Sequence, residues 1–271
     1  MGSEMCIRDS PRETPLLRMN PFAFPENIHI LEHIDRLVEI FNACWPMYAA
    51  MPAVLKDAIE RSYQKVGWAL RNSESEKGVF PTFFDLLDIL PGVIEESHYS
   101  KDTQSDYVGA LCTRVKSLTN GIYGSVLCAE EALSDAEMFD QNVIVDLSRV
   151  GSMETKSLLM GILVMKLQEY RMCSSGMNSR LRHVTVLEEA HNLLRKTSAE
   201  QSQEGANLQG KSVEMLANAI AEMRTYGEGF IIADQAPGLL DMSVIRNTNT
   251  KIILRLPDEE DRLSLIHISE P

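Results

Sequence analysis

The sequence lacks three features that would assign it quickly to a class. No uninterrupted apolar run approaches the roughly 20 residues that a membrane-spanning helix needs. Net positive charge is absent, since the formal charge is −13 over 271 residues, which argues against a broad surface that coats nucleic acid. No metal-ligand spacing occurs among the interior cysteines, which are Cys44, Cys112, Cys128 and Cys173. We therefore predict a globular, cytoplasmic protein with reduced thiols and no membrane segment.

The two ends of the chain differ from its interior. Residues 1–10 (MGSEMCIRDS) and 263–271 (LSLIHISEP) look like translations, in opposite orientations, of the transposase-end adaptor used in shotgun DNA sequencing. Neither string extends a neighbouring pattern, and an independent coincidence at both ends is the weaker explanation. Such segments are left out of fold reasoning. We interpret both ends as adaptor-derived artefacts and residues 11–262 as the protein proper.

The spacing of apolar residues changes near residue 141. Before it, apolar residues recur every three or four positions, and Gly, Pro, Asn and Ser separate the runs. This pattern predicts a helical subdomain over residues 28–121. After it, short β-branched runs alternate with helical segments, the longest of them predicted at 154–172 and 212–226. The predicted strands are 143–147, 184–187, 230–233 and 251–256. Apolar strands separated by helices indicate an α/β fold with one parallel sheet covered on both faces.

The strongest local signal is the segment 183–194, HVTVLEEAHNLL. It predicts a buried strand that ends in Glu188 and Glu189, at the edge where open α/β sheets bind ligands. In nucleotide hydrolysis, one such carboxylate helps to hold Mg²⁺ and the next polarises the attacking water. The residues alone leave a second interpretation open, in which two solvated glutamates begin a helix and interact with its dipole.

Several motifs together resemble the HerA/FtsK superfamily of P-loop ATPases. The segment VLEEAHNLL is similar to the Walker B segment of that superfamily, MRTYGEG to its Arg-plus-Gly turn, and IIADQAPGLLD to its sensor strand. Their order and spacing match, and with NVIVDLS and NPF the resemblance covers most of residues 11–262. It implies a RecA-like P-loop ATPase core over residues 122–262, without its first strand. Residues 11–27 would begin this core, and the helical subdomain would be inserted into it.

The resemblance implies a role for each matching residue. Glu188 would be associated with Mg²⁺ through water, and Glu189 would be the catalytic base. Gln235 would be the sensor that contacts the γ-phosphate or the attacking water. Arg224 would be the finger offered to the nucleotide of a neighbouring subunit. Without the resemblance, Gln235 could equally bond the next loop, and Arg224 would be a cation favoured by the end of a helix.

The implied protein is an ATP-driven DNA translocase or helicase of the HerA type. It would form a homo-oligomeric ring, a hexamer, with ATP and Mg²⁺ as cofactors, DNA as a partner, and a nuclease or a secretion system as a further partner. Two alternatives stay open. One is the motor of a type IV secretion or conjugation system, which shares the motifs. The other is a non-catalytic helical interaction module on a degenerate ATPase scaffold.

The sequence departs from the superfamily in its phosphate-binding loop. No G-x-x-x-x-G-K-[ST] motif occurs in residues 11–141, ahead of the acidic strand. A formal match at 205–212, GANLQGKS, follows a polar segment and not a core strand. We interpret it as a chance match; the alternative makes Lys211 a phosphate ligand and Asp234 its Mg²⁺ acid. The functional loop is expected upstream in the intact protein, so this fragment is predicted to be inactive alone.

Overall fold

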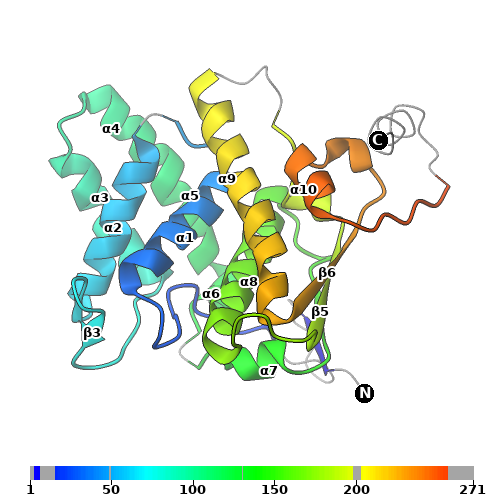
Figure 1. Ribbon diagram of the computed structural model, residues 1–271. Coiled ribbons are helices and arrows are strands. Elements are labelled where there is room, and N and C mark those ends of the chain that lie inside the picture. Colours follow the sequence, from blue (N-terminus) through cyan, green and yellow to red (C-terminus); the bar gives the residue numbers. More distant parts are fainter. Residues whose placement is uncertain (1–2, 7–15, 49, 130, 198–202, 256–271) are drawn as a thin grey trace. The chain divides into compact units, whose positions relative to one another are not determined.

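The computed structural model describes residues 3–6, 16–48, 50–129, 131–197 and 203–255 (Figure 1). Its contacts divide the chain into two compact units, Met1–Glu39 with Tyr48–Gly151 and Ile40–Met47 with Ser152–Pro271. The first unit holds most of the helices predicted from the apolar spacing, and the second holds the acidic motif. Helix α1, Ile30–Cys44, begins in the first unit and ends in the second.

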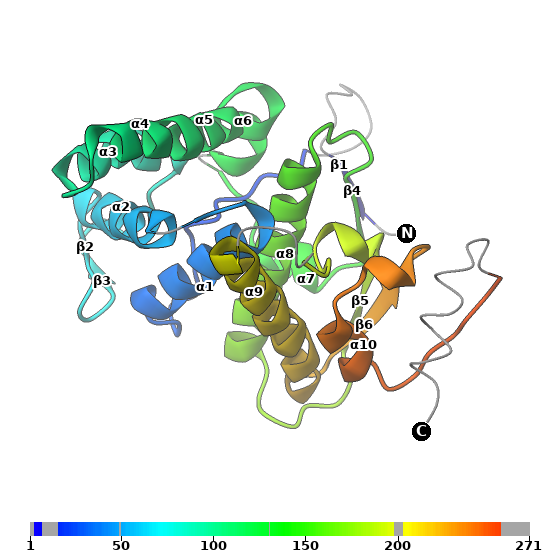
Figure 2. The same cartoon turned by 90° about the horizontal axis from the view of Figure 1, so that it is seen from above.

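The first unit is built mainly from short helices, and Figure 2 shows α3 to α6 following one another. After α1 these are α2 Met51–Lys65, α3 Phe83–Glu96, α4 Lys101–Tyr107, α5 Thr113–Thr119, α6 Gly121–Leu127 and α7 Asp135–Phe139, with a π-helical turn at Val108–Cys112. Two short antiparallel strands, β2 Trp68–Ala69 and β3 Glu74–Ser75, follow α2. Thr82 and Asp85 form a capping box that starts α3, which satisfies free N–H groups of its first turn. The core includes Phe22, Tyr63 and Phe83, all fully buried.

A parallel strand pair also belongs to the first unit. Strand β4, Val143–Asp146, pairs with β1, Ser3–Cys6, in the register Ser3↔Val143 to Cys6↔Asp146. Residues interpreted as adaptor-derived therefore occupy a strand position beside β4. An edge strand offers unpaired N–H and C=O groups to any extended segment that reaches it. This pair makes the compact unit larger than the predicted helical subdomain.

The second unit holds the strands that carry the acidic and sensor motifs. Strands β5, His183–Glu188, and β6, Glu228–Ala233, are parallel, and each of the six residues of β5 pairs with one of β6. Figures 1 and 2 show α8 and α9 on the same side of this pair. The helices of the unit are α8 Met153–Ser174, α9 Gln203–Glu222 and α10 Met242–Asn247. On the strands, Val184, Val186 and Ile231 are exposed.

Three of the four predicted strands form, but the prediction of one sheet is wrong for the described residues. Strand β4 pairs with β1, whereas β5 and β6 form a pair of their own. Residues 251–255 are not a strand, and residue 256 lies outside the described part. Ile252 and Leu254 are 85% and 82% exposed. A β-branched run favours a strand only where neighbours offer packing and ladder hydrogen bonds, and no described strand pairs with this segment.

The predicted helices agree more closely with the structure. Helix α8 corresponds to the predicted helix at 154–172 and starts after Ser152, whose side chain accepts a hydrogen bond from Thr155 N. Helix α9 begins earlier than predicted, at Gln203, and is followed by a 3-10 turn at Met223–Tyr226. No described helix is long and apolar enough to cross a membrane. The interior cysteines are free thiols, and burial raises the pKa of Cys44 to about 12.

Candidate functional site

The carboxyl ends of β5 and β6 meet at one edge of the strand pair. Glu188, the last residue of β5, pairs with Ala233, the last residue of β6. Because the strands are parallel and in register, Glu189 and Gln235 follow them at the same edge. Glu188, Glu189 and Gln235 are all exposed there. The structure thus brings these predicted site residues to one edge, while their chemical roles stay predictions.

The two glutamates leave this edge in different directions. Side chains alternate along a strand, so Glu188 shares the face of Val184 and Val186, which are 42% and 54% exposed. Glu189 instead contacts Lys156 of α8, a helix on the other side of the strands. Carboxylates on opposite sides of the strands argue against joint binding of one ion and favour the second interpretation of the sequence, in which the two glutamates are solvated.

The backbone of Glu189 has an unusual conformation. Its φ and ψ angles are 49° and 46°, in the left-handed region, which costs a residue other than glycine roughly 1–3 kcal/mol. A 3-10 turn at Ala190–Asn192 follows, in which Asn192 N donates to Glu189 O at 2.9 Å and Ala190 is fully buried. The acidic pair therefore precedes a single turn. This differs from the interpretation in which two glutamates begin an α-helix.

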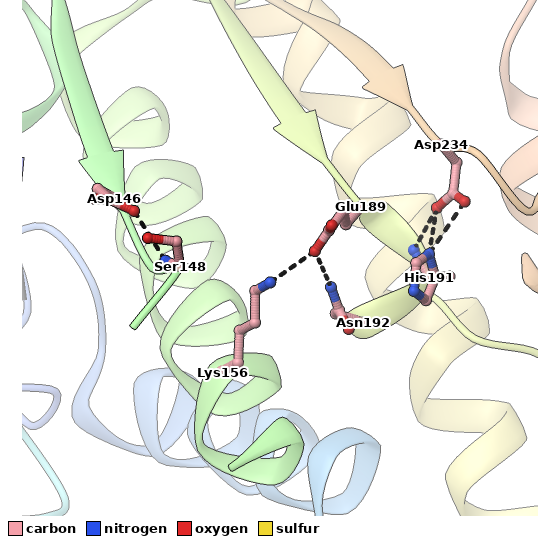
Figure 3. Close-up of polar contacts among 7 residues, drawn as sticks. All are labelled: Asp146, Ser148, Lys156, Glu189, His191, Asn192 and Asp234. Atoms are coloured by element: carbon pink, nitrogen blue, oxygen red, sulfur yellow. Dashed lines mark hydrogen bonds and ion pairs between the residues drawn. The ribbon is translucent and has the colours of Figure 1, made fainter. Parts of the chain in front are cut away.

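Two side chains bind the carboxylate of Glu189 (Figure 3). Lys156 Nζ lies 2.7 Å and Asn192 Nδ2 3.3 Å from the same oxygen, Oε2. The hydrogen bond and charge of Lys156, followed by the bond from Asn192, lower the pKa of Glu189. Among the described residues no side chain bonds Oε1. The contacts that lower the pKa of Glu189 are thus made to one oxygen, and the other has no side-chain partner among the described residues.

A second carboxylate ties together the turns that follow β5 and β6. The side chain of Asp234 is 4% exposed and accepts hydrogen bonds from His191 N and Ala236 N, both at 2.8 Å. His191 Nδ1 lies 2.9 Å from the same carboxylate (Figure 3). Three nitrogen atoms, His191 N, His191 Nδ1 and Ala236 N, thus contact the carboxylate of Asp234. The contacts of Asp234 with His191 and Ala236 connect the turn after β5 to the turn after β6. Glu189 lies two residues before His191, and Gln235 stands between Asp234 and Ala236.

The alternative phosphate site at 205–212 is wrong. Residues Gln203–Glu222 form helix α9, so the backbone N–H groups of its interior are used in helical hydrogen bonds and cannot converge on a phosphate. Its proposed Mg²⁺ acid, Asp234, is buried and already bonded, as described above. Lys211 is an exposed residue of this helix.

Arg224 lies at the opposite end of the strand pair. It is exposed in the 3-10 turn Met223–Tyr226, just before β6 begins at Glu228. Six residues of strand separate this turn from the edge that carries Gln235, which corresponds to about 20 Å at about 3.3 Å per residue. Arg224 therefore cannot reach the acidic edge of its own chain.

Sequence reasoning missed the residues that hold these groups in place. Glu228 is fully buried, and its carboxylate contacts Arg171 Nε at 2.8 Å, His183 Nδ1 at 2.7 Å and Thr185 Oγ1 at 2.7 Å. The signal for it was a charged residue between two glycines immediately ahead of an apolar strand. Lys156, 33 residues before its partner Glu189, gave no comparable signal in sequence.

Asp146, the last residue of β4, contacts the turn that follows the strand. Its Oδ1 accepts a hydrogen bond from Ser148 N at 2.8 Å (Figure 3). The residue that caps the amino end of α8 is Ser152. A carboxylate that bonds the amide two residues on stabilises a tight turn, so Asp146 ends β4 without capping the helix.

Comparison with known proteins finds similarity in fold. No family model and no curated protein matches the sequence. The structure of VirB4 of Thermoanaerobacter pseudethanolicus is similar with a TM-score of 0.65 and 17% identity, over 93% of this chain and 65% of that one. The bacterial conjugative coupling protein TrwB gives a TM-score of 0.48 and 12% identity, over 90% of this chain and 52% of that one. The chain thus shares its α/β fold with the VirB4 structure, and the similarity is one of fold alone.

Proposed function

We propose that the chain supplies the acidic pair, the sensor and the finger of an ATP-hydrolysing ring motor. Glu189 is the base, Gln235 senses the γ-phosphate, and Arg224 reaches the nucleotide of the next subunit. One observation carries the proposal: β5 and β6 are parallel and in register through Glu188↔Ala233. Glu189 and Gln235 therefore lie at the carboxyl edge of the strand pair, and Arg224 lies just before the amino end of β6.

The contacts of Glu189 suit the removal of a proton from water. Lys156 and Asn192 hold Oε2, so Oε1 is the oxygen that takes the proton. The water oxygen then forms a bond to the γ-phosphorus while the bond from that phosphorus to the ADP oxygen breaks, and inorganic phosphate and ADP result. Glu188 is an exposed carboxylate, a group suited to holding Mg²⁺ through the waters that this ion retains. The ion would neutralise charge on the phosphates.

Two further parts of the motor are proposed to come from outside the residues that the structure describes. The first is the phosphate loop, for which the sequence offers only the helical segment 205–212. The second is a layer over the exposed face of Val184, Val186 and Ile231, because parallel sheets are covered on both faces. A hexameric ring then sets Arg224 of one subunit against the acidic edge of its neighbour.

A secretion motor is the second candidate beside a HerA-type DNA translocase. The fold similarity to VirB4 favours it, whereas the sequence motifs suit both. Either would act in the cytoplasm, and both need the same hydrolytic site. Duplex DNA added to the assembled ATPase separates them: we expect severalfold stimulation of turnover from a DNA translocase. Unchanged turnover would favour the secretion motor.

The hydrolytic role of Glu189 is tested in the protein in which a phosphate loop precedes this chain. We expect Glu189→Gln to bind ATP normally and to lose a factor of roughly 100 to 10,000 in turnover, the usual contribution of a general base. The matched control is Glu214→Gln, at an exposed glutamate of α9. Turnover near that of the unmodified protein in Glu189→Gln would remove Glu189 from the mechanism.

A further inference from the structure

The turn that carries Arg224 has little conformational freedom. Met223, its first residue, is fully buried, and Gly227, which follows it, has a φ of +83°. A Cβ atom at Gly227 would clash with the carbonyl oxygen of Arg180. Gly227 N also donates to Arg224 O at 3.1 Å. These contacts hold the backbone at the point where the turn leads into Glu228.

Glu228 fixes the turn to two neighbouring elements. Its side chain is 0% exposed, and its Oε2 pairs with Arg171 Nε of α8 at 2.8 Å. Its Oε1 accepts a hydrogen bond from Thr185 Oγ1 of β5 and contacts His183 Nδ1, both at 2.7 Å. Charge-assisted contacts of this kind are short and directional. The residue four places after Arg224 is thereby held against α8 and β5 at once.

Backbone hydrogen bonds connect the same turn to the loop ahead of β5. Ser179 N donates to Thr225 O at 3.1 Å, and Arg182 N donates to Gly227 O at 2.8 Å. Arg224 itself projects from this assembly as an exposed side chain. The backbone around it is thus fixed on both flanks, while the guanidinium stays accessible to another molecule.

We propose that Glu228 is a positioning residue for Arg224, and that it acts by holding the turn from which the guanidinium reaches a neighbouring subunit's nucleotide. The inference rests on the proposed function, since it assigns Glu228 to the finger of that site. Glu228 is buried and touches no nucleotide, so its contribution is geometric. A misplacement of about 1 Å at a reacting group can cost roughly 100-fold in rate, and we expect a loss of this order in Glu228→Gln.

Mixed oligomers separate a positioning role from a general structural one. A ring that mixes Arg224→Ala with Glu189→Gln contains interfaces where an intact finger meets an intact acidic edge, so some turnover returns. If Glu228 acts through the finger, Glu228→Gln also regains turnover when mixed with Glu189→Gln, and none when mixed with Arg224→Ala. Asp234→Asn is the matched control, because Asp234 is the buried carboxylate just past the other end of the same strand. It should show the reverse pattern.

A milder variant covers the case in which Glu228→Gln fails to fold. Thr185→Val removes one hydrogen bond to Glu228 and leaves the charges of the pair unchanged. We expect Thr185→Val to lose less turnover than Glu228→Gln and to regain it in the same mixed oligomers. Unchanged turnover in Thr185→Val and Glu228→Gln, or recovery of either with Arg224→Ala, would overturn the proposal.

Hydrogen exchange in the 271-residue chain gives a readout that needs no nucleotide. In Thr185→Val or Glu228→Gln, the amides of Arg182 and Gly227 at the turn should exchange faster, whereas those of Asn192 and Ala236 at the acidic edge should not change. Equal exchange at the turn in all variants would refute the anchoring itself. Faster exchange at the turn, combined with full turnover in Arg224→Ala, would instead refute the proposed function.

Discussion

The two ends of the β5–β6 pair each hold a carboxylate, but in opposite environments. At the amino end, Glu228 is fully buried and every contact of its carboxylate is to protein. At the carboxyl end, the side chain of Glu189 is 52% exposed, and its two side-chain contacts share one oxygen. The first arrangement engages both oxygens of the carboxylate, whereas the second leaves one oxygen without a side-chain contact among the described residues. A buried carboxylate needs partners for its whole charge, so only the exposed one can serve a substrate.

The backbone follows the same division. The amino end has a positive φ at a glycine, Gly227, where it costs little. The carboxyl end has it at Glu189, where the strain must be offset by surrounding contacts. Asp234 and the buried Ala190 provide those contacts. The strained backbone thus lies at the end with the exposed carboxylate, and the unstrained one at the end with the buried carboxylate.

The largest effect that tests this comparison is expected from Arg224→Ala. Arginine fingers contribute roughly 10³- to 10⁵-fold to turnover, and we expect a loss in this range in the assembled ATPase, with ATP binding retained. Arg71→Ala, at an exposed arginine of the first unit, is the control and should not change turnover. If Arg224→Ala changes turnover only slightly, the amino end of the strand pair has a structural role and no catalytic one.

A second prediction concerns stability, which should depend more on the amino end. Removing one partner of a buried ion pair costs about 3–5 kcal/mol, so Glu228→Gln should lower the free energy of unfolding by this amount. Asp234→Asn should cost less, about 1–3 kcal/mol, because it impairs hydrogen bonds to a neutral backbone and a histidine. Urea unfolding of the 271-residue chain measures both. Equal losses would mean that the two carboxylates are structurally equivalent.

The two ends of the strand pair also differ in how much of their structure could be predicted from the sequence. The register brings Glu188, Glu189 and Gln235 to one edge because the apolar strands of a parallel pair end together. The alternation of side chains and the contact of Glu189 with Lys156 nevertheless send the two carboxylates to opposite sides. Glu228 was overlooked although it stands between two glycines, because its partner Arg171 lies 57 residues away and local sequence does not show that the two pair. Local periodicity reveals where strands end, whereas long-range pairing of charges becomes visible only in the fold.

The strand prediction at 251–256 failed for a related reason. Its β-branched pattern is as strong as that of β6, yet Ile252 and Leu254 are almost fully exposed. A strand is stabilised by its neighbours and not by its own residues. Composition identified a segment able to form a strand, but the partner that would pair with it is not among the described strands.

Lys156→Met should have a smaller effect, confined to the carboxyl end. Exposed ion pairs contribute about 0–1 kcal/mol, so turnover should fall less than about fivefold. In the chain without Mg²⁺, the pKa of Glu189 should rise toward its ordinary value, because Lys156 is the main cause of its lowering. The stability that this pair contributes is present above the unfolded pKa and is lost as pH falls through the lower, folded pKa.

Carbon-detected NMR titration of Glu189 measures this shift. Lys156→Arg is the control, since it keeps the positive charge and should keep the pKa low. If Lys156→Met leaves the pKa of Glu189 unchanged, the contact seen in the structure does not persist in solution. Glu189 at the exposed carboxyl end would then lack its ion pair with Lys156.

The smallest effect is expected when Mg·ATP is added to the 271-residue chain itself, which should produce no saturable binding in the micromolar range. Most affinity for a nucleotide in such sites comes from a phosphate loop, whose backbone N–H groups and lysine contact the β- and γ-phosphates. Here the segment 205–212 is part of helix α9, so those N–H groups are not free to bind.

What the chain offers at the carboxyl end is negative charge. Glu188 and Glu189 repel a polyphosphate unless a cation and a phosphate loop offset them, and the formal charge of −13 adds to this repulsion. Isothermal titration calorimetry with Mg·ATP tests the expectation, with Lys211→Ala as the matched variant. Tight binding that Lys211→Ala abolishes would show that α9 rearranges around the nucleotide. The acidic edge, Glu189 included, would then lose its place as the hydrolytic site.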